Sequence, residues 1–228
     1  LERHAVKKVI SMQGNDMKTQ NCVCSKQGCW RDDEEKIPKY CQANKFLDEI
    51  EVSKGEYQKT SNIGIYEAAC VVGAENDGFR PRIEETLHFM KHLHLTKVGF
   101  AACAAFENEM RTLEKLFAQE GLEVVCAACQ IGWITAEERG IPKLGDYVNS
   151  TCNPIAQAKI LNREQTEINF IIGLCLGHDI LFTRYSKAPV STLIVKDRMT
   201  GNNPAAALYG YHARRSLFKL PRIDKKKM

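Results

Sequence analysis

The stretch INFIIGLCLGHD, residues 168–179, decides the fold. Its first part is apolar and rich in β-branched side chains, which predicts a buried β-strand. A glycine-punctuated turn follows and holds Cys175 and His178, and an amphipathic pattern over residues 178–187 then predicts a helix. The stretch therefore delivers a thiol and an imidazole from the end of a strand to a helix N-terminus.

The same order of elements appears earlier in the chain. The segments KVGFAAC (97–103) and LEVVCAAC (122–129) also read as strands that end in cysteine, with an amphipathic helix over residues 106–120 between them. A fourth strand is predicted at residues 191–195. Strands that alternate with helices at this spacing predict an α/β fold, with a Rossmann-like or flavodoxin-like parallel sheet flanked by helices. Further helices are predicted at residues 45–54, 61–76, 82–93, 154–162 and 204–218.

The chain has 228 residues, enough for one well-buried domain and a small appendage. We expect four segments: an N-terminal extension (1–20), a cysteine-rich metal-binding segment (21–60), an α/β domain (61–220) and a basic tail (221–228).

Charge and hydropathy exclude several function classes. The net charge is only +4, and the basic residues are spread out apart from Lys225–Lys227, so a nucleic-acid partner is not expected. No apolar run approaches the roughly 20 residues that cross a membrane, and no secretion-signal pattern is present at the N-terminus. We therefore expect a soluble, cytoplasmic protein. Its ten cysteines then indicate metal or redox chemistry rather than a disulfide framework.

One group of cysteines lies near the N-terminus. Cys22, Cys24, Cys29 and Cys41 follow the spacing C-x-C-x4-C-x11-C, in a segment too charged to form its own core. A tetrahedral thiolate site would replace the missing hydrophobic burial, so we expect these four residues to bind a metal. Free thiols in a loop and a functional disulfide are the alternatives.

A second group follows the predicted strands. Cys103, either Cys126 or Cys129, and Cys175 fall at the carboxyl edge of a parallel sheet, where open α/β proteins bind ligands. Cys152 directly precedes an Asn-Pro pair that predicts a helix N-terminus, which stabilises a thiolate. We therefore expect four thiols from four segments to meet at this edge. The alternative is that these cysteines are small core residues.

Ligands that are all sulfur select zinc, iron–sulfur clusters or copper(I). Structural zinc sites usually draw on short C-x2-C knuckles, so the wide spacing favours a [4Fe–4S] cluster or a metal with an open position beside His178. Three roles stay open for His178: a metal ligand, a proton shuttle or a hydrogen-bond partner of the backbone. Dithiol exchange at Cys126 and Cys129 is disfavoured, because the residues that follow are a poor helix start.

The other residues that could carry chemistry are expected to have structural or peripheral roles. Cys70 is expected in the core, and Lys196, Asp197 and Arg198 are expected at the edge of the site, where they would hold an anionic ligand. The histidines at 88, 92 and 94 lack the glutamate of an H-E-x-x-H motif, so we expect them to be solvated or to cap a helix. The sequence has no phosphate-binding glycine motif and no serine nucleophile elbow, so nucleotide binding and serine hydrolysis are not supported.

Two runs, CNPIAQAKILN (152–162) and GLCLGHDILFTRYSKAPVSTLIVKDRMTGNNPAAALY (173–209), give the chain a family resemblance. With their motifs CNP, GLCxGHD, SKAP and VKDR, they resemble the uncharacterised metal-binding family known as domain of unknown function 1847. The resemblance covers about residues 21–212. It implies a cysteine-rich, metal-binding cytoplasmic protein with no established reaction.

The family's motif cysteines carry over position by position. The family's first cysteine pair is usually separated by two residues, whereas one residue separates Cys22 from Cys24. Cys126 and Cys70 are local additions. The cysteines that match are Cys103, Cys129, Cys152 and Cys175, with Cys22, Cys24, Cys29 and Cys41 in the N-terminal group.

Together these observations predict a metal-binding protein with a [4Fe–4S] cluster or zinc at the carboxyl edge and a second, structural metal on the N-terminal cysteines. Electron transfer or a cluster-assisted small-molecule reaction would follow, with a redox partner protein or a small-molecule ligand as partner. The alternative is a non-catalytic adaptor stabilised by zinc, or a metal carrier. Whether the protein is an enzyme stays open at this stage, as does its oligomeric state.

Overall fold

The computed structural model describes residue 37 and residues 41–76, 78–140 and 150–219. Its contacts divide the chain into two units, between Tyr66 and Glu67. The predicted N-terminal extension and the predicted basic tail lie outside the described residues. The first unit contains a short 3-10 helix, η3 (Gln42–Asn44), then α2 (Leu47–Glu56) and the start of α3 (Thr60–Asn76).

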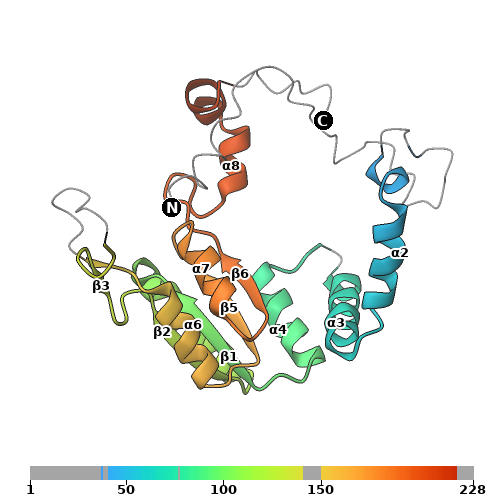
Figure 1. Ribbon diagram of the computed structural model, residues 1–228, viewed down its shortest axis with the longest axis horizontal. Helices are drawn as coiled ribbons and strands as arrows, with labels where there is room; N and C mark the ends of the chain where they lie inside the picture. The colour runs from blue at the N-terminus through green and yellow to red at the C-terminus, as the bar shows by residue number, and fades with distance from the viewer. Residues whose placement is uncertain (1–36, 38–40, 77, 141–149, 220–228) are drawn as a thin grey trace. The chain divides into compact units, whose positions relative to one another are not determined.

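The second unit is built on a four-stranded sheet in the order β2-β1-β5-β6 (Figure 1). All neighbouring strands are parallel, which confirms the predicted α/β class. Counted along the chain, the strands of this sheet follow the order 2-1-3-4, as in flavodoxin-like folds. The strands are β1 (Lys97–Ala102), β2 (Glu123–Ala128), β5 (Ile168–Ile172) and β6 (Val190–Ile194).

Helices cover both faces of this sheet. Phe100 of β1 and Phe170 of β5 lie side by side, and Phe117 of α5 stacks edge-on against Phe100 with ring centroids 5.0 Å apart. Helix α5 therefore covers one face, while α6 packs beside α7 on the other (Figure 1). The helices of the second unit include α4 (Arg82–His92), α5 (Glu107–Gln119), α6 (Pro154–Arg163) and α7 (His178–Tyr185).

Two predicted segments differ in detail. The helix expected over residues 204–218 is interrupted at Gly210, whose ψ of 127° is extended, so α8 (Pro204–Tyr209) ends there and a π-helical turn, η5 (Ala213–Leu217), follows. Within the long excursion at 131–150, β3 (Ile134–Thr135) and β4 (Ser150–Thr151) pair as a small antiparallel sheet.

The prediction that Cys70 belongs to the core is wrong. Cys70 is exposed, and α3 instead buries Ala68 and Val72, which are four residues apart and share one face of the helix. Residue 70 lies two positions from each of them, about 200° around the helix, and therefore points the other way.

Candidate metal centre

The carboxyl ends of β1 and β5 lie side by side at the point where the strand order reverses. β2 lies beyond β1 and β6 lies beyond β5, so the two connections leave in opposite directions. Open α/β sheets bind their ligands at this switch point. The backbone N–H of Cys103, the first residue after β1, donates to the carbonyl oxygen of Ile172 at 3.0 Å. Cys103 therefore stands at the centre of the carboxyl edge.

The turn after β5 brings Cys175 to the same edge. Its first residue, Gly173, has a φ of +62°, and its N–H donates to the carbonyl oxygen of Ile194 at the end of β6. A Cβ at this position would come within 2.0 Å of the ring of buried Phe106. Glycine is therefore required both for the backbone conformation and for the close packing beneath the turn.

Cys129 and Cys152 are joined through the start of α6. The backbone N–H of Asn153 donates to the carbonyl oxygen of Cys129 at 2.9 Å. Oδ1 of Asn153 accepts from the N–H of Ala156 at 3.0 Å, which confirms the predicted N-cap, and Nδ2 donates to the carbonyl oxygen of Gly132 at 2.7 Å. The capping residue thus fixes Cys152 beside the loop that carries Cys129.

Cys126 does not take part, which decides between the two cysteines that end the second predicted strand. It lies inside β2 and pairs in register with Phe100, whose side chain faces α5. Its thiol donates to Glu114 of α5 at 2.9 Å. Burial and this carboxylate raise the pKa of the Cys126 thiol well above its usual range.

Lys196, two residues beyond β6, joins two of the thiols. Its ammonium donates to Sγ of Cys103 at 2.7 Å and to Sγ of Cys175 at 3.3 Å. Burial lowers the pKa of Lys196, but the two sulfur contacts outweigh it and raise the pKa on balance. A fixed cation therefore lies among the sulfurs. We call Cys103, Cys129, Cys152 and Cys175 the thiol cluster.

The thiols of the cluster have unequal acidity. Burial acts to raise the pKa of Cys103, but the Lys196 ammonium and the N–H of Ala105 lower it below its usual value. Burial is the main cause that raises the pKa of Cys129 to about 12. The N–H of Ala104, which donates to its sulfur at 3.4 Å, acts in the opposite direction, and Cys152 and Cys103 raise the pKa further. Cys103 is therefore the more acidic thiol of the pair and Cys129 the less acidic one.

The thiol cluster runs from the core to the surface. Cys129 is 3% exposed and Cys103 is 9% exposed, whereas Cys152 is partly buried and Cys175 is exposed. A small reactant or an ion can reach the cluster from the side of Cys175. The inner thiols are shielded from bulk water.

The donor set of the cluster suits a thiophilic centre, because it offers sulfur ligands and a neighbouring positive charge. The Lys196 ammonium is hydrogen-bonded to two of the sulfurs. Within the described residues, no three Cys, His, Asp or Glu side chains are arranged so that they already enclose an ion. The residues therefore fit such a centre in their chemistry and would have to close around it.

Gln157 of α6 supports the inner edge of the cluster and was not singled out from the sequence. Its Nε2 donates to the carbonyl oxygens of Ala102 (3.2 Å) and Ala127 (2.6 Å), which lie near the ends of β1 and β2. The side chain is fully buried, and within the described part of the chain its Oε1 has no partner. The signal that the sequence offered for this residue was a polar side chain within the apolar stripe of α6.

His178 and Asp179 begin α7. The backbone N–H of His178 donates to the carbonyl oxygen of Cys175, and the imidazole is partly buried, with no hydrogen bond or ion pair to another described residue. Asp179 Oδ1 accepts from the N–H groups of Gly177 and Ile180, both at 2.8 Å. Asp179 thus stabilises the helix start, and His178 remains available for chemistry.

The residues that follow Lys196 are turn residues. Asp197 Oδ1 accepts from the N–H groups of Met199 (3.0 Å) and Thr200 (3.2 Å), and Arg198 is exposed. Of the three residues expected to hold an anion, Lys196 contacts the sulfurs of Cys103 and Cys175.

The N-terminal group of cysteines falls largely outside the described residues. Cys22, Cys24 and Cys29 are among the residues left undescribed. Cys41 is partly exposed and directly precedes η3. The predicted N-terminal metal site therefore stays a prediction.

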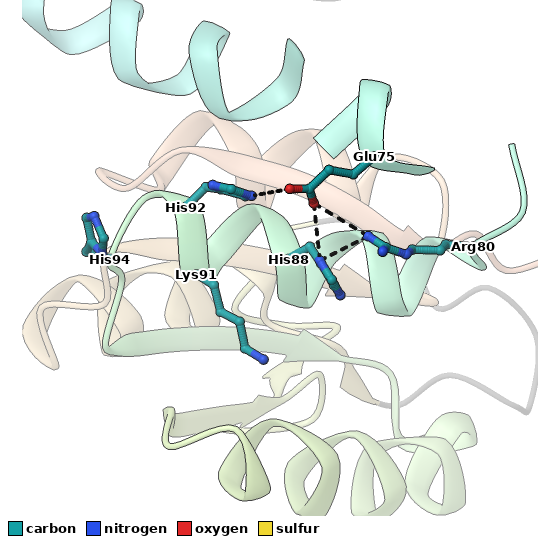
Figure 2. Close-up of a pocket in the computed structure, with 6 residues that line it drawn as sticks. All are labelled: Glu75, Arg80, His88, Lys91, His92 and His94. Atoms are coloured by element: carbon teal, nitrogen blue, oxygen red, sulfur yellow. Dashed lines mark hydrogen bonds and ion pairs between the residues drawn. The ribbon is translucent and has the colours of Figure 1, made fainter. Parts of the chain in front are cut away.

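The histidines of α4 lie around a carboxylate rather than at the thiol cluster (Figure 2). Glu75 Oε2 lies 3.5 Å from Nδ1 of His88, and Glu75 Oε1 lies 3.4 Å from Nε2 of His92. Arg80 Nη1 lies 3.0 Å from Nδ1 of His88 and 3.6 Å from Glu75. These groups line an open pocket of about 690 Å³ with Lys91 and His94. The guanidinium beside both acceptors opposes a metal ion there.

None of the helices in the described ranges combines the length and the apolar character that a membrane span requires.

Comparison with known proteins connects the thiol cluster to a family. The family model described as "Protein of unknown function (DUF1847)" matches residues 41–193, a range that includes Cys41 and the whole thiol cluster. The uncharacterised protein MJ0455 of Methanocaldococcus jannaschii is 40% identical to this chain over 155 residues, which is 68% of this chain and 80% of the relative. The chain therefore belongs to the DUF1847 family of proteins of unknown function.

Proposed function

We propose that this protein binds a thiophilic metal centre, a [4Fe–4S] cluster or zinc, through Cys103, Cys129, Cys152 and Cys175. One observation carries the proposal: four cysteines from four separate segments collect at the switch point of a flavodoxin-like sheet. Cysteines that served only as small packing residues would have no reason to gather there.

The surroundings of the cluster support this assignment. The Lys196 ammonium and the N–H of Ala104 both donate to sulfur, so positive charge and donors already face the ligand atoms. Such groups favour thiolates and set the reduction potential of a bound cluster. The gradient of exposure, from Cys129 to Cys175, gives a route for loading.

When bound, an iron–sulfur cluster would supply one-electron chemistry, and zinc would supply a structural or Lewis-acid centre. Electron transfer to a redox partner protein, or a reaction on a small-molecule ligand, would follow in the first case. His178 is the group placed to hold or move a proton beside Cys175, because its imidazole has no partner among the described residues. We place the protein in the reducing cytoplasm, where thiolate ligands persist.

A second metal, held by Cys22, Cys24, Cys29 and Cys41, completes the proposal. Four thiols within a short charged segment suit a structural thiolate site. This site must be separated from the thiol cluster in any metal analysis, because both would take the same ions.

The test uses a chain in which Cys22, Cys24, Cys29 and Cys41 are replaced by serine. The protein is purified without oxygen, and iron, zinc and acid-labile sulfide are measured per chain. We expect about one centre per chain, with broad absorbance at about 400 nm if it is an iron–sulfur cluster. A colourless protein with stoichiometric zinc would instead indicate the adaptor or metal-carrier reading.

Single replacements in this background locate the ligands. Cys152→Ser and Cys175→Ser should each lower the bound metal several-fold. Cys126→Ser is the matched control, because Cys126 is a neighbouring thiol that faces Glu114 instead of the cluster. Equal metal content in all three variants, or no metal in the parent, would refute the proposal.

A further inference from the structure

Lys196 is placed unusually close to a cysteine sulfur. Its Nζ lies 2.7 Å from Sγ of Cys103 and 3.3 Å from Sγ of Cys175. Even N–H···O hydrogen bonds, which involve the smaller oxygen atom, centre on about 2.9–3.0 Å. The nitrogen and the Cys103 sulfur are thus at a separation that a single bridging oxygen atom can span.

We propose that Cys103 and Lys196 form a reversible covalent N–O–S bridge when hydrogen peroxide reaches the metal-free thiol cluster. The bridge links the segment after β1 to the segment after β6, and it is made from atoms of this chain and one oxygen atom of the oxidant. No metal takes part in its formation, so the inference does not depend on which metal the cluster binds.

The chemistry balances in two steps. In the first, hydrogen peroxide oxidises the Cys103 thiol to a sulfenic acid and leaves as water, so that the sulfur gives up two electrons. In the second, Lys196 reacts as the amine, after its additional proton has passed to water. A second hydrogen peroxide accepts two electrons, the sulfenic O–H and one N–H bond break, the N–O bond forms, and two waters are released.

Reduction reverses both steps. Four equivalents of a monothiol return the Cys103 thiol and the Lys196 amine, with one water and two small-molecule disulfides as products. The bridge is therefore a reversible oxidation state, unlike sulfinic or sulfonic acid.

Distance favours Cys103 over Cys175 as the bridged residue. Cys103 is the sulfur nearer to Lys196 Nζ, so a sulfenic oxygen on Cys103 forms beside the amine that captures it. Cys175 is exposed and lies farther from the nitrogen, so peroxide can oxidise it further before an amine captures it. The partly exposed Lys196 and the open side of the cluster still admit a molecule as small as peroxide.

The bridge would also close the cluster to metal. It removes one sulfur and the positive charge of Lys196 from the site, so a bridged chain should load less metal than a reduced one. Only this consequence rests on the proposed function; formation of the bridge does not.

The test is intact-mass spectrometry of the full chain, reduced, freed of metal by a chelator, and then treated with hydrogen peroxide. One N–O–S bridge adds about 14 Da, whereas each simple oxygen addition adds about 16 Da and a disulfide removes about 2 Da. We expect the species heavier by about 14 Da, its return to the starting mass with dithiothreitol, and a cross-linked tryptic peptide that contains Cys103 and Lys196.

Variants assign the two ends. Cys103→Ser and Lys196→Arg should each abolish the species, while Cys175→Ser and the control Cys126→Ser should keep it. If wild-type protein shows only oxygen additions or disulfides, or if Cys103→Ser keeps the species, the proposal is overturned. The mass is read without metal, so a failed bridge and a failed metal site give different results.

Discussion

Replacing Asn153 with alanine should destabilise the second unit and loosen Cys152 at the same time. Asn153 makes two side-chain hydrogen bonds at the start of α6: it accepts from the N–H of Ala156 at 3.0 Å and donates to the carbonyl oxygen of Gly132 at 2.7 Å. Alanine removes both. The helix then lacks its cap, and the loop that follows Cys129 lacks its anchor.

The size of the effect follows from these two bonds. Loss of an N-cap side chain costs about 1 kcal/mol. Loss of a hydrogen bond to a backbone carbonyl costs about 1 kcal/mol more. We therefore expect Asn153→Ala to lower the free energy of unfolding by about 2 kcal/mol, which corresponds to a fall in Tm of about 4–8 °C for a domain of this size. Asn153→Asp keeps the acceptor for Ala156 and loses only the donor, so it should cost about half as much.

The assay is urea unfolding of reduced, metal-free protein, followed by circular dichroism. Lys159→Ala is the matched control, because Lys159 is an exposed residue of α6 away from its cap, and its loss should change stability by less than about 0.5 kcal/mol. If Asn153→Ala and Lys159→Ala unfold at the same urea concentration, the assignment of Asn153 as the residue that fixes Cys152 is wrong.

Three further predictions test other parts of the structure. Gly173→Ala should lower the free energy of unfolding in urea by about 3 kcal/mol, because the new Cβ meets the Phe106 ring and the backbone has a positive φ. Gly121 has a φ of +80° but open space around it, so Gly121→Ala should cost only about 1 kcal/mol. Equal costs would contradict the packing argument. Glu167→Gln should cost about 1 kcal/mol at pH 7. The N–H of Thr96 and then that of Lys97 lower the pKa of Glu167. Its contribution to stability is therefore present above the ordinary carboxyl pKa and is lost as the pH falls through the lowered value. A difference between variant and wild type that persists in acid, or an equal loss in the exposed control Glu67→Gln, would count against this assignment. Glu114→Gln should make alkylation of Cys126 by iodoacetamide several-fold faster at pH 8, because the carboxylate, in addition to burial, raises the pKa of that thiol. The control Glu109→Gln should leave the alkylation rate unchanged. An unchanged rate in Glu114→Gln would refute the contact.

Much of the sheet could be predicted because its signals are local. A buried strand such as β5 is a short apolar run, and the Asn-Pro pair at Asn153 marks the start of α6 through capping chemistry alone. The break at Gly210 was missed because a single glycine inside a helical pattern only lowers helix propensity and does not by itself mark a helix end.

Which thiols belong to the candidate site depends on how β2 is paired with β1, and the sequence alone does not give that strand register. Cys126 and Cys129 were equal candidates as long as the end of β2 was uncertain. The strand continues to Ala128, and pairing of Cys126 with Phe100 turns its thiol toward α5. A shift of one residue would have exchanged the two faces, so the local pattern alone could not decide between the two thiols, whereas the family resemblance already favoured Cys129.

The position of Lys196 explains how several thiols can lie close together at this edge of the sheet. Thiolates that lie close together repel one another, and burial adds a desolvation cost that raises their pKa values. At this switch point the Lys196 ammonium reaches both Cys103 and Cys175, and Cys129 stays protonated beside them. The chain thus places its own cation among the sulfurs. A metal ion would compete with that ammonium for the same sulfurs. An oxidant would meet the Lys196 nitrogen and the Cys103 sulfur already in contact. The bonding partner of Lys196 therefore distinguishes the free, metal-loaded and oxidised forms of the site.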